Sequence, residues 1–340
     1  MAKKIGIAVI GCGRIGRVHA ANLANLTGTT LTFVYDAMPQ AAKKLGAELN
    51  AQVADSVEQI FADDATQAVI ICSPTPTHIQ LIKQAVLAGK KILCEKPLTR
   101  TLKESISCMD FVAKHKAILM VGFNRPYDPG VYALRQRVAK GEVGNIEHVQ
   151  ITSRDPAAPP MAYLKLAGGI FLDMMIHDFE MALRLLPDKP VALSAMASAI
   201  TDKAIGKIGD HDNAVVTMHT AAGATCSIHN CRRAAYGYDQ RVEVAGSKGM
   251  LQAQNLHEDN LISAGSKGFA QAPLQHFFLE RYNQSYRTIV NTFVAAIGGN
   301  KKALEEVRTT NGVNAIYLAE QAAISAKSGK TVKLKLPYAD

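Results

Sequence analysis

A polar stripe near the middle of the chain carries groups that can move a proton. Asp173, His177, Glu180 and Arg184 follow one another at steps of four, three and four residues, which places them on one face of a helix. The other positions are mostly apolar, so the helix is expected to be largely buried. The polar side chains of the stripe must then either form hydrogen bonds and ion pairs within the protein or face a cleft. In a cleft, imidazole, with an ordinary pKa near about 6.5, can act as general base on an alcohol while Asp173 orients the ring.

Three glycines near the N-terminus form a phosphate-binding pattern. Gly11, Gly13 and Gly16 stand in the sequence G-C-G-R-I-G, after an apolar run and at the start of a helical segment. Glycines there permit a tight turn and close approach of a pyrophosphate, which the amides at the helix N-terminus face. Asp36 ends the second apolar run, where a carboxylate accepts hydrogen bonds from ribose hydroxyls and repels a 2′-phosphate. The pattern therefore predicts a dinucleotide site that favours NAD over NADP.

Two further loops leave the expected sheet at its ligand-binding edge. Residues 73–78 follow the apolar run at 68–72, and Glu95, Lys96 and Pro97 follow the run at 92–94. A lysine at that edge can stabilise a developing alkoxide. The cofactor is expected to contact residues of the glycine turn, the ends of the strands and one later asparagine: Gly11, Gly13, Arg14, Ile15, Gly16, Asp36, Ser73, Thr75, His78, Glu95, Lys96 and Asn124.

Composition limits the class of protein. The 340 residues are 48% apolar and 20% charged, typical of a folded chain of about two domains. No run of about 18 uncharged apolar residues occurs, so neither a membrane span nor a membrane partner is expected. The net charge of +9 is scattered along the chain, and no nucleic-acid partner is expected either. Six cysteines without a C-x-x-C pair or a signal peptide indicate reduced thiols in the cytoplasm.

Several residues are open to a second interpretation. Cys226 and Cys231 flank His229, but their odd separation places them on opposite faces of a strand, and no metal site is predicted. His229 is expected to be structural. Tyr236 and Tyr238 either offer hydroxyls to a polyol or pack as a pair.

Short apolar runs alternate with helical segments over the first 122 residues. The runs at 5–10, 31–34, 68–72, 92–94 and 118–121 are those of strands buried on both faces. Repeated strand–helix units predict a Rossmann domain, a doubly wound parallel sheet, at 1–122.

The regular alternation of strand and helix segments ends at Gly122. A proline-rich loop at 155–161 and a long helix at 169–186 precede consecutive strand-like segments at 191–199, 214–220, 225–231 and 240–245. Two helices, at 281–297 and 310–326, and a strand at 330–336 close the chain. We expect a second α/β domain at 123–340 with a large open, mostly antiparallel sheet.

Five blocks of sequence resemble one known family. They are C-E-K-P-L from Cys94, V-G-F-N-R from Val121, I-T-S-R-D-P from Ile151, G-G-I-F-L-D-M-M-I-H-D-F from Gly168 and Y-G-Y-D-Q-R from Tyr236. The chain is similar, over nearly its whole length, to inositol 2-dehydrogenases of the glucose-fructose oxidoreductase and inositol dehydrogenase superfamily.

The resemblance implies roles for particular residues. The family's catalytic lysine, aspartate and histidine fall on Lys96, Asp173 and His177, the three residues already selected. It also implies a cis peptide between Lys96 and Pro97, a polyol pocket lined by Asp155 and Tyr236, and an open sheet that builds dimers or tetramers. Two positions depart from the family pattern, since relatives commonly have arginine at Pro126 and aspartate at Glu180.

The leading expectation is NAD-dependent oxidation of myo-inositol to 2-keto-myo-inositol, with His177 as base. The helix is expected to aim Asp173 and His177 between the two domains, towards Lys96. A dehydrogenase of another inositol isomer or cyclic sugar stays open because Pro126 and Glu180 can move the substrate. From a different class, so does a non-catalytic NAD(H)-binding sensor.

Overall fold

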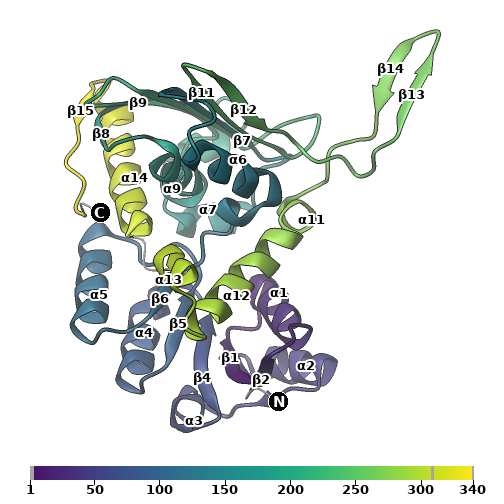
Figure 1. The fold of residues 1–340 in the computed structure, drawn as a ribbon, viewed down its shortest axis with the longest axis vertical. Coiled ribbons are helices and arrows are strands. Elements are labelled where there is room, and N and C mark those ends of the chain that lie inside the picture. The colour runs from purple at the N-terminus through teal and green to yellow at the C-terminus, as the bar shows by residue number, and fades with distance from the viewer. Residues whose placement is uncertain (1–3, 308–309, 339–340) are drawn as a thin grey trace. The chain divides into compact units, whose positions relative to one another are not determined.

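The computed structural model describes residues 4–307 and 310–338, which group into two compact units (Figure 1). One unit takes in the described chain up to Asn124 together with Ser285–Val313. The other holds Arg125–Gln284 and the C-terminal part from Asn314. The segment 285–313 therefore groups with the N-terminal part of the chain, while the domains expected at 1–122 and 123–340 stay a prediction.

The first unit contains a six-stranded parallel sheet in the order β3-β2-β1-β4-β5-β6. The central strands read as continuous apolar runs because both faces are buried; Ile7, Ala8 and Val9 of β1 have no exposed surface. This confirms the predicted doubly wound sheet. Its strands are β1 Ile5–Ile10, β2 Thr29–Tyr35, β3 Gln52–Val53, β4 Thr66–Ile71, β5 Lys91–Cys94 and β6 Leu119–Val121.

The helices of this unit mostly connect successive strands. They are α1 Arg14–Ala24, α2 Pro39–Leu49, α3 Val57–Ala62, η1 Thr75–Thr77, α4 His78–Leu87 and α5 Leu102–Lys114, with α12 Asn283–Ile297 and α13 Lys301–Val307 added from later in the chain. The strand order reverses at β1, whose neighbours are β2 and β4. Ligands of open parallel sheets bind at the carboxyl ends of the strands beside such a reversal.

The second unit contains a seven-stranded sheet in the order β12-β11-β7-β10-β9-β8-β15. Within this sheet, β7 and β10 form the only parallel pair among the described strands, which confirms the mostly antiparallel prediction. Its strands are β7 Ile146–Arg154, β8 Pro190–Ser198, β9 Asn213–Thr220, β10 Thr225–Cys231, β11 Asp239–Gly246, β12 Gly249–Ala253 and β15 Val332–Lys333. Residues alternate along β9, where Val216 is buried and Val215 exposed, so one face packs on helices and the other is exposed.

The remaining elements surround this sheet. The helices are η2 Arg125–Tyr127, α6 Pro129–Ala139, α7 Met161–Ala167, α8 Ile170–Asp173, α9 Ile176–Leu185, α10 Lys203–Lys207, α11 Phe278–Arg281 and α14 Asn311–Ser328. A hairpin of β13 Ile262–Gly265 and β14 Gly268–Gln271 extends away from the sheet of its own unit (Figure 1). No helix in the described part of the chain is both long and apolar enough to cross a membrane.

The single helix predicted at 169–186 is wrong in one respect. It breaks between α8 and α9, where Ile170 O accepts hydrogen bonds from both Met174 N and Met175 N. The break leaves Asp173 as the last residue of α8 and His177 in the first turn of α9. The last strand is also shorter than predicted, and the helix α7 begins directly after the proline-rich loop.

Candidate active site

The glycine turn of the first unit requires glycine at two positions. A Cβ added to Gly16 would lie 1.8 Å from Gly11 O, so the start of α1 packs directly on the backbone after β1. Gly11 has φ +100°, and a Cβ there would lie 2.6 Å from Ser73 N. These contacts match the tight turn and close helix packing that the sequence pattern predicts.

Gly13 differs, because no atom of the described chain lies within 4 Å of a Cβ added there. It is the N-cap of α1 and provides no side-chain cap, so the first amides of an 11-residue helix are left to another acceptor. An anion is the natural ligand of such a helix end. The turn, with Arg14 and Ile15 directly after Gly13, therefore fits the pyrophosphate of a dinucleotide.

Asp36 stands directly after β2, beside this turn. Its Oδ2 accepts from Cys12 N at 2.7 Å and its Oδ1 accepts from Met38 N at 2.8 Å, which fixes the carboxylate in place. Burial and Asp36 raise the pKa of the Cys12 thiol to about 11, so Cys12 stays neutral. Asp36 therefore lies where the adenosine ribose of a bound dinucleotide is expected.

The loops after β4 and β5 are tied together by His78. Its ring Nε2 lies 2.9 Å from Ser73 O and its Nδ1 lies 3.1 Å from Pro97 O. Because His78 is only 1% exposed, it holds the two loops in register. Its direct contact with a cofactor stays a prediction, as do those of Ser73 and Thr75.

The peptide between Lys96 and Pro97 is cis, as the resemblance implied. The preceding Glu95 is anchored on both carboxylate oxygens: Oε1 lies 2.7 Å from His19 Nε2, and Oε2 accepts from Lys96 N at 3.3 Å. Lys96 itself is half-buried.

Asn124 offers a further sign of a ligand in the first unit. Its side chain is 3% exposed, and its Nδ2 has no hydrogen-bond partner among the described residues. A buried amide of this kind requires an acceptor, and the carbonyl groups of a nicotinamide dinucleotide provide one. The residues of this unit therefore fit NAD.

In the second unit, Asp173 is held at both carboxylate oxygens. Tyr163 Oη donates to Oδ1 at 2.7 Å, and Arg232 Nη1 donates to Oδ2 at 3.1 Å. Arg232 is 1% exposed and is fixed in turn by Asp210 at 3.5 Å and by His211 O at 3.4 Å. Sequence reasoning missed Tyr163 and Arg232, since neither belongs to a recognisable spacing pattern.

The predicted polar stripe divides into two parts. Glu180 is fully buried, and its Oε1 accepts a hydrogen bond from Arg184 Nε at 2.5 Å, whereas its Oε2 has no hydrogen-bond partner among the described residues. His177 is half-buried in the first turn of α9, one turn beyond Asp173. The expected approach of Asp173 and His177 to Lys96 stays a prediction.

A buried ion pair next to this stripe was not predicted. Asp178 is 1% exposed, and its Oδ1 accepts from Arg125 Nη1 at 2.6 Å and from Ser153 Oγ at 2.7 Å. Asn230 Nδ2 donates to its Oδ2 at 2.7 Å. The pair joins η2 and α9 to strands β7 and β10, and it anchors the element that carries His177.

Asp155 follows β7 and interacts electrostatically with Arg125, Arg232, Asp173 and Asp178. Burial raises the pKa of its carboxyl to about 6, against the opposing effects of Arg125 and Arg232 and with the help of Asp173. A carboxyl group with such a raised pKa, close to other charged side chains, is typical of a functional site.

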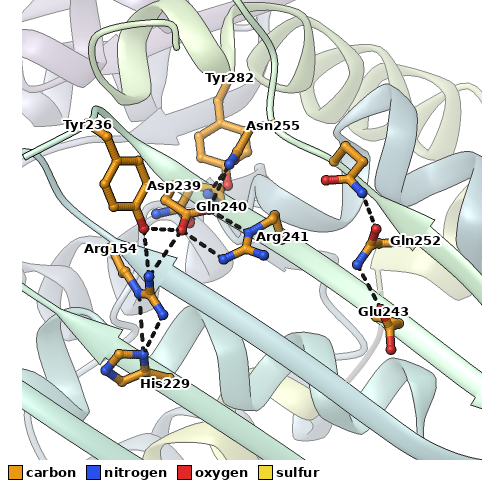
Figure 2. A network of polar contacts seen from close by, with 11 residues as sticks. Arg154, His229, Tyr236, Asp239, Gln240, Arg241, Glu243, Gln252, Asn255 and Tyr282 are labelled. Atoms are coloured by element: carbon orange, nitrogen blue, oxygen red, sulfur yellow. Dashed lines mark hydrogen bonds and ion pairs between the residues drawn. The ribbon is translucent and has the colours of Figure 1, made fainter. Parts of the chain in front are cut away.

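Tyr236 belongs to a polar network at the end of the sheet, shown in Figure 2. Its Oη donates to Asp239 Oδ2 at 2.6 Å and accepts from Arg154 Nη1 at 2.6 Å, while Arg241 Nε donates to Asp239 Oδ1 at 2.7 Å (Figure 2). A cavity of about 520 Å³ lies beside it and is lined in part by Tyr236, Arg241 and His257. Tyr238, in contrast, is buried and packs against Phe277.

His229 is bound within the second unit. Its ring contacts Arg154 through Nδ1 and Asn213 through Nε2. Cys226 is buried and Cys231 is half-buried, as their odd spacing predicts. The described residues contain no group of three or more His, Cys, Asp or Glu side chains placed to hold a metal ion.

Comparison with known proteins gives a consistent result. Residues 5–123 match a family described as "Oxidoreductase family, NAD-binding Rossmann fold", and residues 131–252 match the "GFO/IDH/MocA C-terminal domain". An inositol 2-dehydrogenase of Rhizobium meliloti is 41% identical, over 97% of this chain and 99% of the relative.

Solved structures agree. A putative myo-inositol dehydrogenase from Sinorhizobium meliloti superposes with a TM-score of 0.93 at 40% identity, covering 98% of this chain and 100% of the other. A scyllo-inositol dehydrogenase from Lactobacillus casei, solved with NAD(H) and scyllo-inositol, has a TM-score of 0.88 at 26% identity, covering 97% of this chain and 99% of the other. The chain therefore belongs to the GFO/IDH/MocA family of oxidoreductases, whose N-terminal domain is an NAD-binding Rossmann fold.

Proposed function

We propose that this protein oxidises myo-inositol to 2-keto-myo-inositol with NAD. The observation that carries the proposal is the Asp173 carboxylate, which Tyr163 and Arg232 hold at both oxygens and which lies four residues before His177 in the sequence. The inositol 2-dehydrogenase relatives, which are similar over nearly the whole chain, support the substrate class.

The chain's own side chains divide the work of the reaction. His177 takes the proton of the reacting hydroxyl, and Asp173 orients its ring and stabilises the imidazolium that forms. Lys96 stabilises the alkoxide as it develops. NAD, when bound, supplies the acceptor for the hydride. The residues that hold it are those of the glycine turn, Asp36, the loops after β4 and β5, and Asn124.

The remaining hydroxyls of the polyol are assigned to Asp155 and Tyr236. A carboxylate accepts from a hydroxyl group, and a phenol both donates and accepts, so the two side chains recognise different faces of a ring that carries a hydroxyl at every carbon.

The choice of isomer is tested by a panel. Purified protein is offered myo-inositol, scyllo-inositol, other inositols and pyranose sugars with NAD and with NADP, and formation of reduced cofactor is followed by absorbance. We expect the highest kcat/KM with myo-inositol and NAD. A preference for another cyclic polyol would point to Pro126, buried in η2, and to Glu180, which pairs with Arg184.

The base is tested by His177→Ala. General-base catalysis contributes about 100-fold or more to the rate, so turnover at saturating NAD and polyol should fall by at least that factor. Turnover within threefold of wild type would show that His177 is not the base. NADH binding without turnover of any polyol would favour the non-catalytic sensor.

We further propose that the enzyme acts in the cytoplasm and assembles as a homodimer or homotetramer. The exposed face of the second sheet supports the assembly, because exposed apolar residues such as Val215 and Met196 stand on its strands. Light scattering of the purified protein measures the oligomeric state directly.

A further inference from the structure

We propose that Tyr163 is a gating residue of the polyol site, whose phenol hydroxyl holds Asp173 Oδ1 until a hydroxyl group of the incoming polyol replaces it. The inference rests on the proposed function, since it takes a polyol as the ligand. It assigns a role to a residue outside the sequence blocks that carry the family resemblance, on a helix that the sequence did not predict.

The two sides of Asp173 are held very differently. Arg232 is 1% exposed, and its guanidinium group also bonds Asp210 and His211 O, so it cannot leave without stranding buried charge. Tyr163 is 50% exposed, and its hydroxyl donates to Asp173 Oδ1 at 2.7 Å. The Oδ2 side is therefore fixed, whereas the Oδ1 side can exchange one donor for another.

The helix that carries Tyr163 has few buried side chains and is followed by two glycines, so it can move away from Asp173. Of the seven residues of α7, Leu164 is buried, whereas Leu166 is 69% exposed. Pro159 and Pro160 precede the helix, and Gly168 and Gly169 follow it, both with φ +86°. Glycine adopts this region of φ at little cost, so the paired glycines can absorb a change in backbone direction.

The exchange replaces one hydrogen-bond donor to Asp173 Oδ1 by another. A phenol and a polyol hydroxyl each donate one O–H to a carboxylate oxygen, so replacement leaves the acceptor satisfied throughout. Burial and the neighbouring Asp173 raise the pKa of the Tyr163 phenol, which therefore stays a protonated donor at neutral pH. An anionic sugar with its charged group at this position has no proton to donate. The gate thus selects neutral polyols.

The first test removes the hydroxyl alone, with Tyr163→Phe. The Kd of myo-inositol for the enzyme–NADH complex is measured by titration calorimetry. Loss of the competing hydrogen bond should tighten polyol binding by about 3- to 10-fold, with the Kd of NADH unchanged. An unchanged or weaker polyol Kd would overturn the gate, because Tyr163 would then act as a support for Asp173 or as a direct ligand of the polyol. Leu166→Ala, on the same helix, is the matched control and should leave the Kd unchanged.

The second test needs no substrate. Hydrogen exchange of the α7 amides in the protein without polyol should be faster in Tyr163→Phe than in wild type, and unchanged in Leu166→Ala. Equal exchange in Tyr163→Phe and wild type would show that the hydroxyl does not hold the helix, and the proposal would fail. Failure of the proposed function has a different signature: wild-type protein then turns over no polyol, while the exchange rates still report on the Tyr163–Asp173 bond.

Discussion

Asp155 is predicted to lower the stability of the wild-type protein at neutral pH. Burial raises the pKa of its carboxyl from 3.8 to about 6 in the folded protein, so the folded chain binds this proton more tightly than the unfolded chain does. Its contribution to stability is therefore fully present below about pH 4 and is lost as the pH rises to about 6. A rise of roughly two units corresponds to at most about 3 kcal/mol, and because Asp155 is partly exposed we expect about 1–2 kcal/mol.

The perturbation is Asp155→Asn, which keeps the shape of the side chain and removes its titration. Urea unfolding is measured for both proteins at several pH values from 4 to 8, with equal m values as the check on the unfolded state. The free energy of unfolding of the variant, relative to that of wild type, should rise by about 1–2 kcal/mol between pH 4 and pH 8. The variant should also bind myo-inositol more weakly, because the carboxylate acceptor is lost. A stability difference that stays constant across this range would refute the reasoning.

Three further predictions concern the two units separately. Gly13→Ala should leave the melting temperature unchanged and weaken NAD binding at least tenfold, as measured by calorimetry. Gly16→Ala, whose Cβ would lie 1.8 Å from a backbone oxygen, should instead lower the free energy of unfolding by about 1–3 kcal/mol. Equal effects of the two variants on stability would contradict the different packing of the two glycines. Asp36→Asn removes a charge that repels a 2′-phosphate, so the ratio of kcat/KM for NAD over NADP should fall, and an unchanged ratio would place the ribose elsewhere. Arg232→Met leaves Asp173 and Asp210 without their buried cation and should cost about 3–5 kcal/mol in urea unfolding, a loss below 1 kcal/mol being incompatible with the pairing described.

The parts of the fold that the sequence predicted are those with local signals. The parallel sheet was predictable because strands buried on both faces are uninterrupted apolar runs. The break between α8 and α9 was not, because Met174 and Met175 continue the apolar pattern across it. Helix α7 was hidden by the prolines before it, which typically mark a loop and here only end one at Pro160.

The candidate site divides in the same way. Asp173 and His177 were found because they share a spacing along one segment. Arg232 lies 59 residues from Asp173, and Asp178 lies 53 residues from Arg125, so only the folded sheet brings each pair together. The partners that fix a functional side chain are therefore the part of a site that local spacing does not reveal.

The grouping of Ser285–Val313 with the first unit affects how the chain folds during synthesis. All six strands of the first sheet precede Asn124, but the Tyr286 ring that packs on His19 and the Ser285 hydroxyl that bonds Asn124 O come only after Arg125–Gln284 has been made. At about 5–20 residues per second, the ribosome needs roughly 10–30 s to translate that segment. The first unit must therefore wait, with part of its surface uncovered, until Arg125–Gln284 of the second unit has been made, and the second unit in turn needs the chain from Asn314, which is made last.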